Sequence, residues 1–334
     1  MKIISFNSYK GGACRTTTCF NTLPYLAKAL NATSEEPILV YDIDLDSMGL
    51  TNLFHVGEKP SEERMRYSAK NLFVEDDEGI NQTVQRELGR DKIDAFYGYH
   101  EKVGETLGLD DCGSVLFLGA DRNAPTITDD DFVRYSDDAP IERFIRAIEY
   151  MKNTAKKPKA IVFDCASGMQ MTTLTALGLA DSAVVCMRPT YQFRVGTGDY
   201  VLNQIPAEIN KSFDGKKREI VLLPTAVSQI NVPENEPNRD EVLNRLNDLR
   251  DGAFNAIDSD IVMRYKRIQK MTKFRYTLNT DMFEDDESAV KGLPEIERFK
   301  WEETLLYGMK PEEMTEQERI LQKQYEKLAN ILAR

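Results

Sequence analysis

Six short apolar runs, separated by stretches with helical character, constrain the fold of this chain most strongly. Runs that are apolar throughout are typical of strands buried on both faces, and strand–helix alternation is typical of a parallel sheet. The sequence therefore predicts an α/β fold, with a parallel, mainly Rossmann-like sheet and helices on both faces. The expected strands cover 2–6, 37–44, 114–120, 159–165, 182–187 and 219–225, and the expected helices cover 16–30, 140–153, 170–180, 194–206 and 239–257.

Composition narrows the class of protein. The 334 residues suffice for one large domain, expected to span 1–334, and the net charge of −12 argues against a surface that binds nucleic acid everywhere. No apolar run approaches the roughly 20 residues that a membrane helix needs, and the N-terminus lacks a secretory pattern. The five cysteines have neither metal-binding nor disulfide spacing, which favours a reducing cytoplasm.

Two regions depart from the strand–helix alternation. Residues 57–111 are polar and charged, which predicts a mostly helical insertion or a solvated excursion without chemistry. Residues 226–289 form a variable helical region that contains the only dense basic run, at 264–276. That run could bind phosphate backbones or an acidic partner, or it could be a solvated face that neutralises the acidic stretch 281–287. Its basic residues are Arg264, Lys266, Arg267, Lys270, Lys273 and Arg275.

A C-terminal helix is expected within 314–334. An apolar stripe runs along one side of it, and such a stripe more often packs against a sheet than binds a membrane or a partner. The stripe consists of Leu321, Tyr325, Leu328 and Leu332.

The stretch "YKGGACRTTT" at 9–18 follows the first expected strand and begins the first expected helix. Gly11 and Gly12 allow a tight turn that brings backbone amides close to phosphate oxygens, and the helix N-terminus favours negative charge at the same place. Thr16 offers a hydroxyl to Mg²⁺, and Thr17 can bond an α- or β-phosphate oxygen. The stretch therefore predicts a phosphate-binding loop, with a generic glycine-rich turn as the alternative.

Aspartates end two other expected strands. Asp42 and Asp44 lie in "VYDIDLDSMGL", on the same side of the strand end, and Asp164 ends the apolar run "KAIVFDC". Carboxylates in these positions could hold Mg²⁺ through water or orient a nucleophilic water. Because the carboxyl ends of parallel strands form the ligand-binding edge of a sheet, we expect all three near the loop.

These motifs together resemble the ParA/MinD family of P-loop ATPases. "KGGACRTTT" is similar to the family's deviant Walker A loop, KGGxGK[ST][ST], with Lys10 at its identifying lysine. "DIDLDSMGL" and Arg15 are closest to a subgroup that reads KGGxGR[ST] and DxDLxxxGL, and "RPTYQFRVGT" resembles that subgroup's later segment. The resemblance covers 2–54 and 114–225 well and 290–308 loosely.

The resemblance implies ATP and Mg²⁺ as ligands and a face-to-face homodimer with ATP at its interface. Lys10 would reach the partner's phosphates, and Asp44 would orient the attacking water, so these are the implied catalytic residues. Thr16, Asp42 and Asp164 would surround Mg²⁺, partly through water. The implied nucleotide-binding residues are Gly11, Gly12, Ala13, Cys14, Arg15, Thr16, Thr17 and Pro189.

Two letters of the loop depart from the commoner family pattern. Arg15 replaces the second lysine, which keeps the charge but changes the geometry. Cys14 replaces a glycine, and we expect Lys10 and Arg15 to lower the pKa of its thiol.

The resemblance favours an ATP-dependent dimerising switch that hydrolyses ATP slowly and positions or regulates DNA, a protein complex or another cargo. The alternative is an ATP-bound scaffold without useful turnover. A partner protein is expected in either case, and nucleic acid would bind only through the local basic run.

Overall fold

A computed structural model gives the architecture of the chain. It describes residues 1–54, 69, 73, 100–120, 144–145, 148–149, 157–211, 216–228, 230, 232–271, 276–283, 291–300 and 304–334.

One sheet of seven parallel strands organises the molecule, in the order β3-β2-β4-β1-β5-β6-β7. The six expected strands are all present, which confirms the α/β prediction. The seventh, β7, is short and was not predicted, because only part of it is buried. The strands are β1 (Lys2–Ser8), β2 (Ile38–Ile43), β3 (Val115–Leu118), β4 (Ala160–Cys165), β5 (Ser182–Met187), β6 (Arg218–Pro224) and β7 (Tyr276–Asn279).

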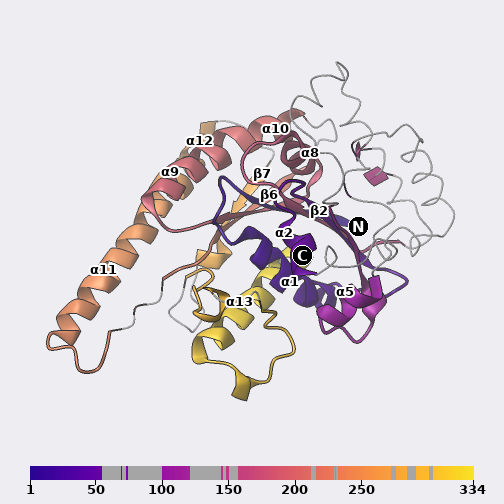
Figure 1. The fold of residues 1–334 in the computed structure, drawn as a ribbon. Coiled ribbons are helices and arrows are strands. Elements are labelled where there is room, and N and C mark those ends of the chain that lie inside the picture. Colours follow the sequence, from indigo (N-terminus) through magenta and orange to yellow (C-terminus); the bar gives the residue numbers. More distant parts are fainter. Residues whose placement is uncertain are drawn as a thin grey trace.

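Helices cover both faces of the sheet (Figure 1). Alternate strand residues point to opposite cores: Ile4 packs on the face of α1 (Arg15–Ala29), whereas Ile3 packs on the face of α8 (Met171–Leu179). Because successive strand side chains alternate between faces, strands covered on both sides must be apolar at almost every position. The first face also carries α2 (Gly49–Leu53), α5 (His100–Thr106) and α13 (Glu316–Ala333).

The expected helix at 194–206 is divided into three segments. It begins as α9 (Tyr191–Asp199), passes through a π-helical turn at Tyr200–Gln204 and continues as α10 (Ile205–Lys211). The helix expected at 239–257 is α11 (Arg239–Ile257), which a second π-helical turn at Asp258–Val262 joins to α12 (Met263–Met271). Figure 1 shows α11 extending away from the sheet.

The expected C-terminal helix is α13, and it packs mainly against α1. Thr315 and Glu318 form a reciprocal capping box at its start. Its apolar stripe is buried in the core shared with α1, not presented to solvent. Among the described residues, no helix is both long enough and apolar enough to cross a membrane.

The insertion expected at 57–111 lies mostly outside the described residues. Its last part forms α5, and two earlier residues, Ala69 and Phe73, are fully buried. Phe73 stacks on Phe144 with ring centroids 4.4 Å apart. The insertion therefore contributes to the core at these points. Most of the helix expected at 140–153 also lies outside the described residues.

Candidate functional site

The loop between β1 and α1 has the backbone of an anion-binding turn. Gly12 has a φ of 78°, and Cys14 has a φ of 52°, both in the left-handed region. Gly11 and Gly12 are exposed, and a β-carbon at either would meet no atom within 4 Å. Thr225, at the end of β6, anchors the loop by donating its hydroxyl to the Ala13 carbonyl at 2.8 Å. The loop is thus anchored to β6 through Ala13, whereas its glycines are exposed to solvent.

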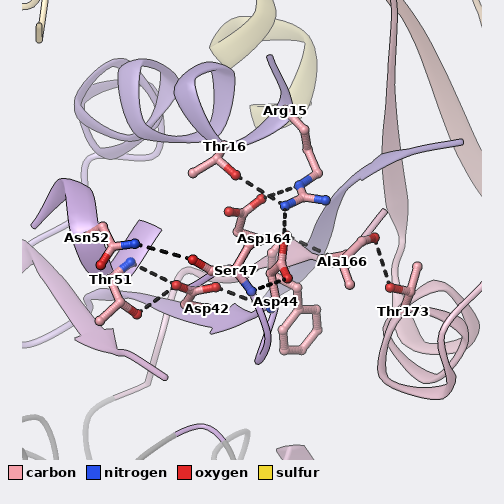
Figure 2. Close-up of polar contacts among 12 residues, drawn as sticks. Arg15, Thr16, Asp42, Asp44, Ser47, Thr51, Asn52, Asp164, Ala166 and Thr173 are labelled. Atoms are coloured by element: carbon pink, nitrogen blue, oxygen red, sulfur yellow. Dashed lines mark hydrogen bonds and ion pairs between the residues drawn. The ribbon is translucent and has the colours of Figure 1, made fainter. Parts of the chain in front are cut away.

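Arg15 brings together the three sequence motifs, as Figure 2 shows. Its Nη2 lies 2.6 Å from Asp44 Oδ2, and its Nε lies 2.8 Å from Asp164 Oδ1. The guanidinium is almost fully buried, with 8% of the side chain exposed. The expected convergence of loop and aspartates is therefore present, but Arg15 turns towards the carboxylates instead of the open side of the loop.

Burial and mutual charge control the ionisation of this cluster. Burial alone would lower the pKa of Arg15, but Asp164 and Asp44 outweigh it and raise that pKa. Burial raises the pKa of Asp164 despite the opposing charge of Arg15. Burial, with the nearby Asp164 carboxylate, raises the pKa of Asp42 to about 7. The site therefore holds fewer negative charges near neutral pH than its aspartates suggest.

Asp42 lies beside Asp164 across the β2–β4 pair, but its oxygens face another segment. Its Oδ2 accepts from the backbone N and the hydroxyl of Thr51, at 2.8 and 2.7 Å. Its Oδ1 accepts from the backbone N of Asp44 at 3.2 Å. These contacts fix α2 and the strand end that carries Asp44. Both oxygens of Asp42 thus accept hydrogen bonds from the protein, and Asp42 contributes to the site by positioning Asp44.

The residues around Thr16 fit a magnesium ion. Oδ2 of Asp164 is buried and has no hydrogen-bond partner among the described residues. Thr16 supplies a hydroxyl nearby, and Gly49 keeps it close, because a β-carbon at Gly49 would fall 3.0 Å from Thr16 Oγ1. Hydroxyl and carboxylate oxygens suit Mg²⁺, which usually keeps several waters and phosphate oxygens. No group of three or more His, Cys, Asp or Glu positioned for a metal occurs in the described part of the chain.

Lys10 rests on an aromatic ring. Its Nζ lies 4.9 Å from the centroid of Phe193, a residue of α9. The preceding Tyr9 packs closely on the same helix, since a β-carbon at Gly196 would lie 2.0 Å from the Tyr9 ring. Lys10 is half-buried and near the open loop, but its charge is held on α9 by a cation–π contact.

A cleft of about 210 Å³ adjoins the loop. Its walls come from the loop, the end of β6 and the segment 293–299, and Arg188 lies at its border with the loop. Pro189, expected beside the base, is not among the lining residues. The lining residues are Cys14, Thr17, Thr18, Arg188, Thr225, Ala226, Leu293, Pro294, Glu295, Ile296, Phe299 and Tyr325.

The pKa of the Cys14 thiol is shifted in the opposite direction to the one expected. Although Cys14 is exposed as a residue, desolvation of its thiol by neighbouring groups raises the pKa, and the charge of Arg188 opposes this rise. The expectation that Lys10 and Arg15 lower this pKa is wrong, because Lys10 lies on Phe193 and Arg15 is bonded to two carboxylates.

The basic run forms an exposed face of α12. Its four residues in that helix are exposed and make no ion pair with other described residues, namely Arg264, Lys266, Arg267 and Lys270. The expected neutralisation by 281–287 is not seen at Asp281, which lies 3.5 Å from Arg334 instead. Lys273 and Arg275 lie outside the described residues.

Sequence reasoning missed several contributors to the site. Phe193 and Arg188 stand in the segment "RPTYQF", whose likeness to the family subgroup was the available signal. Gly49 stands in the DxDLxxxGL motif, where its packing against Thr16 explains the glycine. Glu295 lies in 290–308, where the resemblance is only loose, and the expected strands and helices do not place 293–299 beside the loop.

No protein-family model and no curated protein matches the sequence. Among solved structures, the chain is similar to the ATP complex of a variant of McdA from Cyanothece. The identity is 13%, the TM-score is 0.56, and the match covers 99% of this chain and 96% of that one. It is also similar to a putative plasmid partition protein from Borrelia burgdorferi bound to AMPPNP, with 15% identity, a TM-score of 0.48 and coverage of 99% and 97%.

A further similarity is to the MinC:MinD cell division protein complex of Aquifex aeolicus, with 17% identity, a TM-score of 0.40 and coverage of 81% and 97%. The McdA comparison spans nearly the whole of both chains, and it establishes that this chain shares the α/β fold of that protein.

Proposed function

We propose that the chain is a ParA/MinD-type ATPase that dimerises with ATP, hydrolyses it slowly with Mg²⁺ and positions or regulates a partner. One observation carries the proposal: the open glycine turn, Asp44 and Asp164 meet at Arg15, at the carboxyl edge of a parallel sheet. Loop amides, a helix N-terminus, a hydroxyl and two carboxylates in one place suit a nucleoside triphosphate with its metal.

The described geometry supports a distinct task for each residue. The amides of the loop from Gly11 to Thr16 would hold the β-phosphate, and the adjoining cleft of about 210 Å³ would take the base and ribose. Thr16 and Asp164 would face Mg²⁺, which when bound supplies positive charge to the phosphates. Asp44 would orient the attacking water once Arg15 leaves its Oδ2, which also accepts from the Ser47 hydroxyl.

Lys10 would act on the nucleotide of a second copy. Its contact with Phe193 is a cation–π interaction, which at a partly exposed site contributes about 0.5–1 kcal/mol. A triphosphate from a partner offers a stronger attraction, so ATP-driven dimerisation can draw Lys10 off the ring. The charge would then neutralise the negative charge that develops on the phosphates in the transition state.

A scaffold without turnover is the second candidate, and the bond between Arg15 and Asp44 favours it. A carboxylate bonded to a buried guanidinium at 2.6 Å is not free to orient water. If ATP leaves that bond intact, the chain would bind nucleotide and dimerise without hydrolysis.

The partner surface would be the exposed face of α12. Four cations on one short helix suit the phosphate backbone of DNA or an acidic protein, even though the chain is acidic overall.

Light scattering with Mg²⁺ and either ADP or ATP, followed over time, tests the proposal. The expected result is a monomer with ADP and a dimer with ATP that decays as phosphate is released. A dimer with ATP that never decays would favour the scaffold. No change of mass with either nucleotide would contradict the dimerising switch.

A further inference from the structure

We infer that Arg188 is a nucleotide-contacting residue, and that it binds the α-phosphate from the cleft side of the loop. This inference rests on the proposed nucleotide binding. It assigns to Arg188 the positive charge that Arg15, committed to two aspartates, does not offer to the phosphates in this structure.

Arg188 bridges the two halves of the site. It follows β5 directly, and its Nε donates to the Gly12 carbonyl at 2.8 Å, on the turn where the loop becomes left-handed. The same side chain lines the cleft together with Thr17. A nucleotide with its phosphates in the loop and its base in the cleft must place its α-phosphate between these two points.

The guanidinium of Arg188 has N–H groups that can donate to a further acceptor. Its Nε donates to the Gly12 carbonyl, its guanidinium also interacts with the Cys14 thiol, and no described carboxylate lies within ion-pair distance. Arg188 and Cys14 line the same cleft, which places the guanidinium beside the loop. Since Arg donates through a planar fork of five N–H groups, these contacts leave further N–H groups available for a phosphate.

The charge balance of the site requires such a group. Arg15 is surrounded by Asp44 and Asp164, so its charge is largely compensated before a nucleotide arrives. Lys10 lies on Phe193 and would serve the partner's nucleotide under the proposed function. Arg188 is the remaining side-chain cation that both contacts the loop and lines the cleft, among the residues that the structure describes.

Nucleotides of different length separate a phosphate contact from simple bracing of the loop. A contact with the α-phosphate is shared by AMP, ADP and ATP. Bracing of the loop acts mainly through the β-phosphate, which the loop amides would hold, so it would affect ADP and ATP but not AMP. Affinities for all three can be measured by displacement of a fluorescent ADP analogue.

The experiment compares the wild type with Arg188→Ala, Arg188→Gln and Arg188→Lys. The expected result is a loss of about tenfold to hundredfold in affinity for all three nucleotides in the Ala and Gln variants, because one charge-assisted contact is removed. Arg188→Lys should recover part of each loss, since it keeps the charge. Arg250→Ala, on α11, is the matched arginine control and should bind normally.

Unchanged affinity for AMP, with weaker ADP and ATP binding, would overturn the inference and leave Arg188 as a brace for Gly12. Unchanged affinity for all three nucleotides in variants that melt like the wild type would also overturn it. If the wild type binds none of the three, the proposed function fails together with the inference.

Discussion

Arg15 Nη2 and Asp44 Oδ2 lie 2.6 Å apart, so the residue expected to grip phosphate is bonded to the residue expected to orient water. Both are nearly buried, and a second carboxylate, Asp164, holds the same guanidinium through Nε. A buried charge with two hydrogen-bonded partners is costly to separate. Under the proposed function, turnover would therefore depend on whether nucleotide and Mg²⁺ displace Arg15 from Asp44.

Arg15→Lys should increase ATP hydrolysis. A lysine offers one compact ammonium in place of a fork, and it cannot bond two separated carboxylates in the same way. Asp44 is then released from the guanidinium, and we expect the rate of phosphate release to rise by about tenfold, a moderate gain for restored positioning. An unchanged rate, with ATP binding intact, would show that Arg15 does not restrain Asp44. Asp44→Asn combined with Arg15→Lys is the control, and it should remove the gain.

Lys10→Ala should abolish the ATP-dependent dimer while each copy still binds ATP. The lysine contacts Phe193 and makes no ion pair within the described part of its own chain, so its loss leaves the local fold intact. Light scattering reports the dimer, and displacement of a fluorescent nucleotide reports binding. Phe193→Leu is the matched variant, because it removes the ring and keeps an apolar side chain. It should preserve the dimer, and a dimer formed equally well by Lys10→Ala would refute the role of Lys10.

Cys14→Gly should stabilise the protein by about 0.5–1 kcal/mol. Cys14 has a φ of 52°, where a β-carbon is strained and glycine is not. Urea unfolding without nucleotide measures the change. Cys14→Ser keeps the β-carbon and loses only the sulfur, so it should bring no such gain. Equal stability of the Gly and Ser variants would mean that the turn carries no strain.

Asp42→Asn should change how stability depends on pH. Burial raises the pKa of Asp42 to about 7, whereas an unfolded aspartate titrates near pH ~4. Between these values the folded state keeps a proton that the unfolded chain releases, so this group's contribution to stability falls as pH rises. The free energy of unfolding of the variant should therefore rise relative to that of the wild type as pH rises from about 4 to about 7. Denaturant unfolding at several pH values tests this, with exposed Asp46→Asn as the control.

Charge reversal on α12 should remove DNA retention if the chain binds DNA. The triple change Arg264→Glu, Arg267→Glu and Lys270→Glu replaces exposed cations without touching the core. Retention on immobilised duplex DNA with ATP should fall to background and should depend steeply on salt in the wild type. The same triple change at Lys310, Arg319 and Lys323 matches the charge difference on another exposed region. Equal loss in both variants would show that only net charge matters.

The fold was predictable because each central strand is buried on both faces and therefore apolar along its length. β1 and β4 have this pattern, and their expected bounds agree with the structure to within about two residues. β7 was missed because it is an edge strand of four residues, of which only Tyr276 is buried. The π-helical turn after Asp199 has no pattern of its own, because its residues continue the apolar face of a helix.

The sequence predicted which residues form the site better than it predicted their contacts. Strand register brings Asp164 beside Asp42, which a parallel sheet requires once both end their strands. The direction of Arg15 could not be foreseen, since it depends on which of two charged groups, phosphate or carboxylate, is nearer to the buried guanidinium. Arg188 was overlooked in favour of Pro189, because the closeness of β5 to the Gly12 carbonyl appears only in three dimensions.

Phe193 and Arg194 are neighbours in α9 that face different parts of the molecule. Phe193 holds Lys10 at the mouth of the loop, and Arg194 Nε lies 2.8 Å from Asp260, in the π-helical turn that leads into α12. On the same helix, a β-carbon at Gly198 would lie at ordinary contact distance, 3.6 Å, from the Ile261 side chain. The helix α9 therefore contacts both the lysine beside the loop and the turn that leads into α12, so the two regions share one structural support.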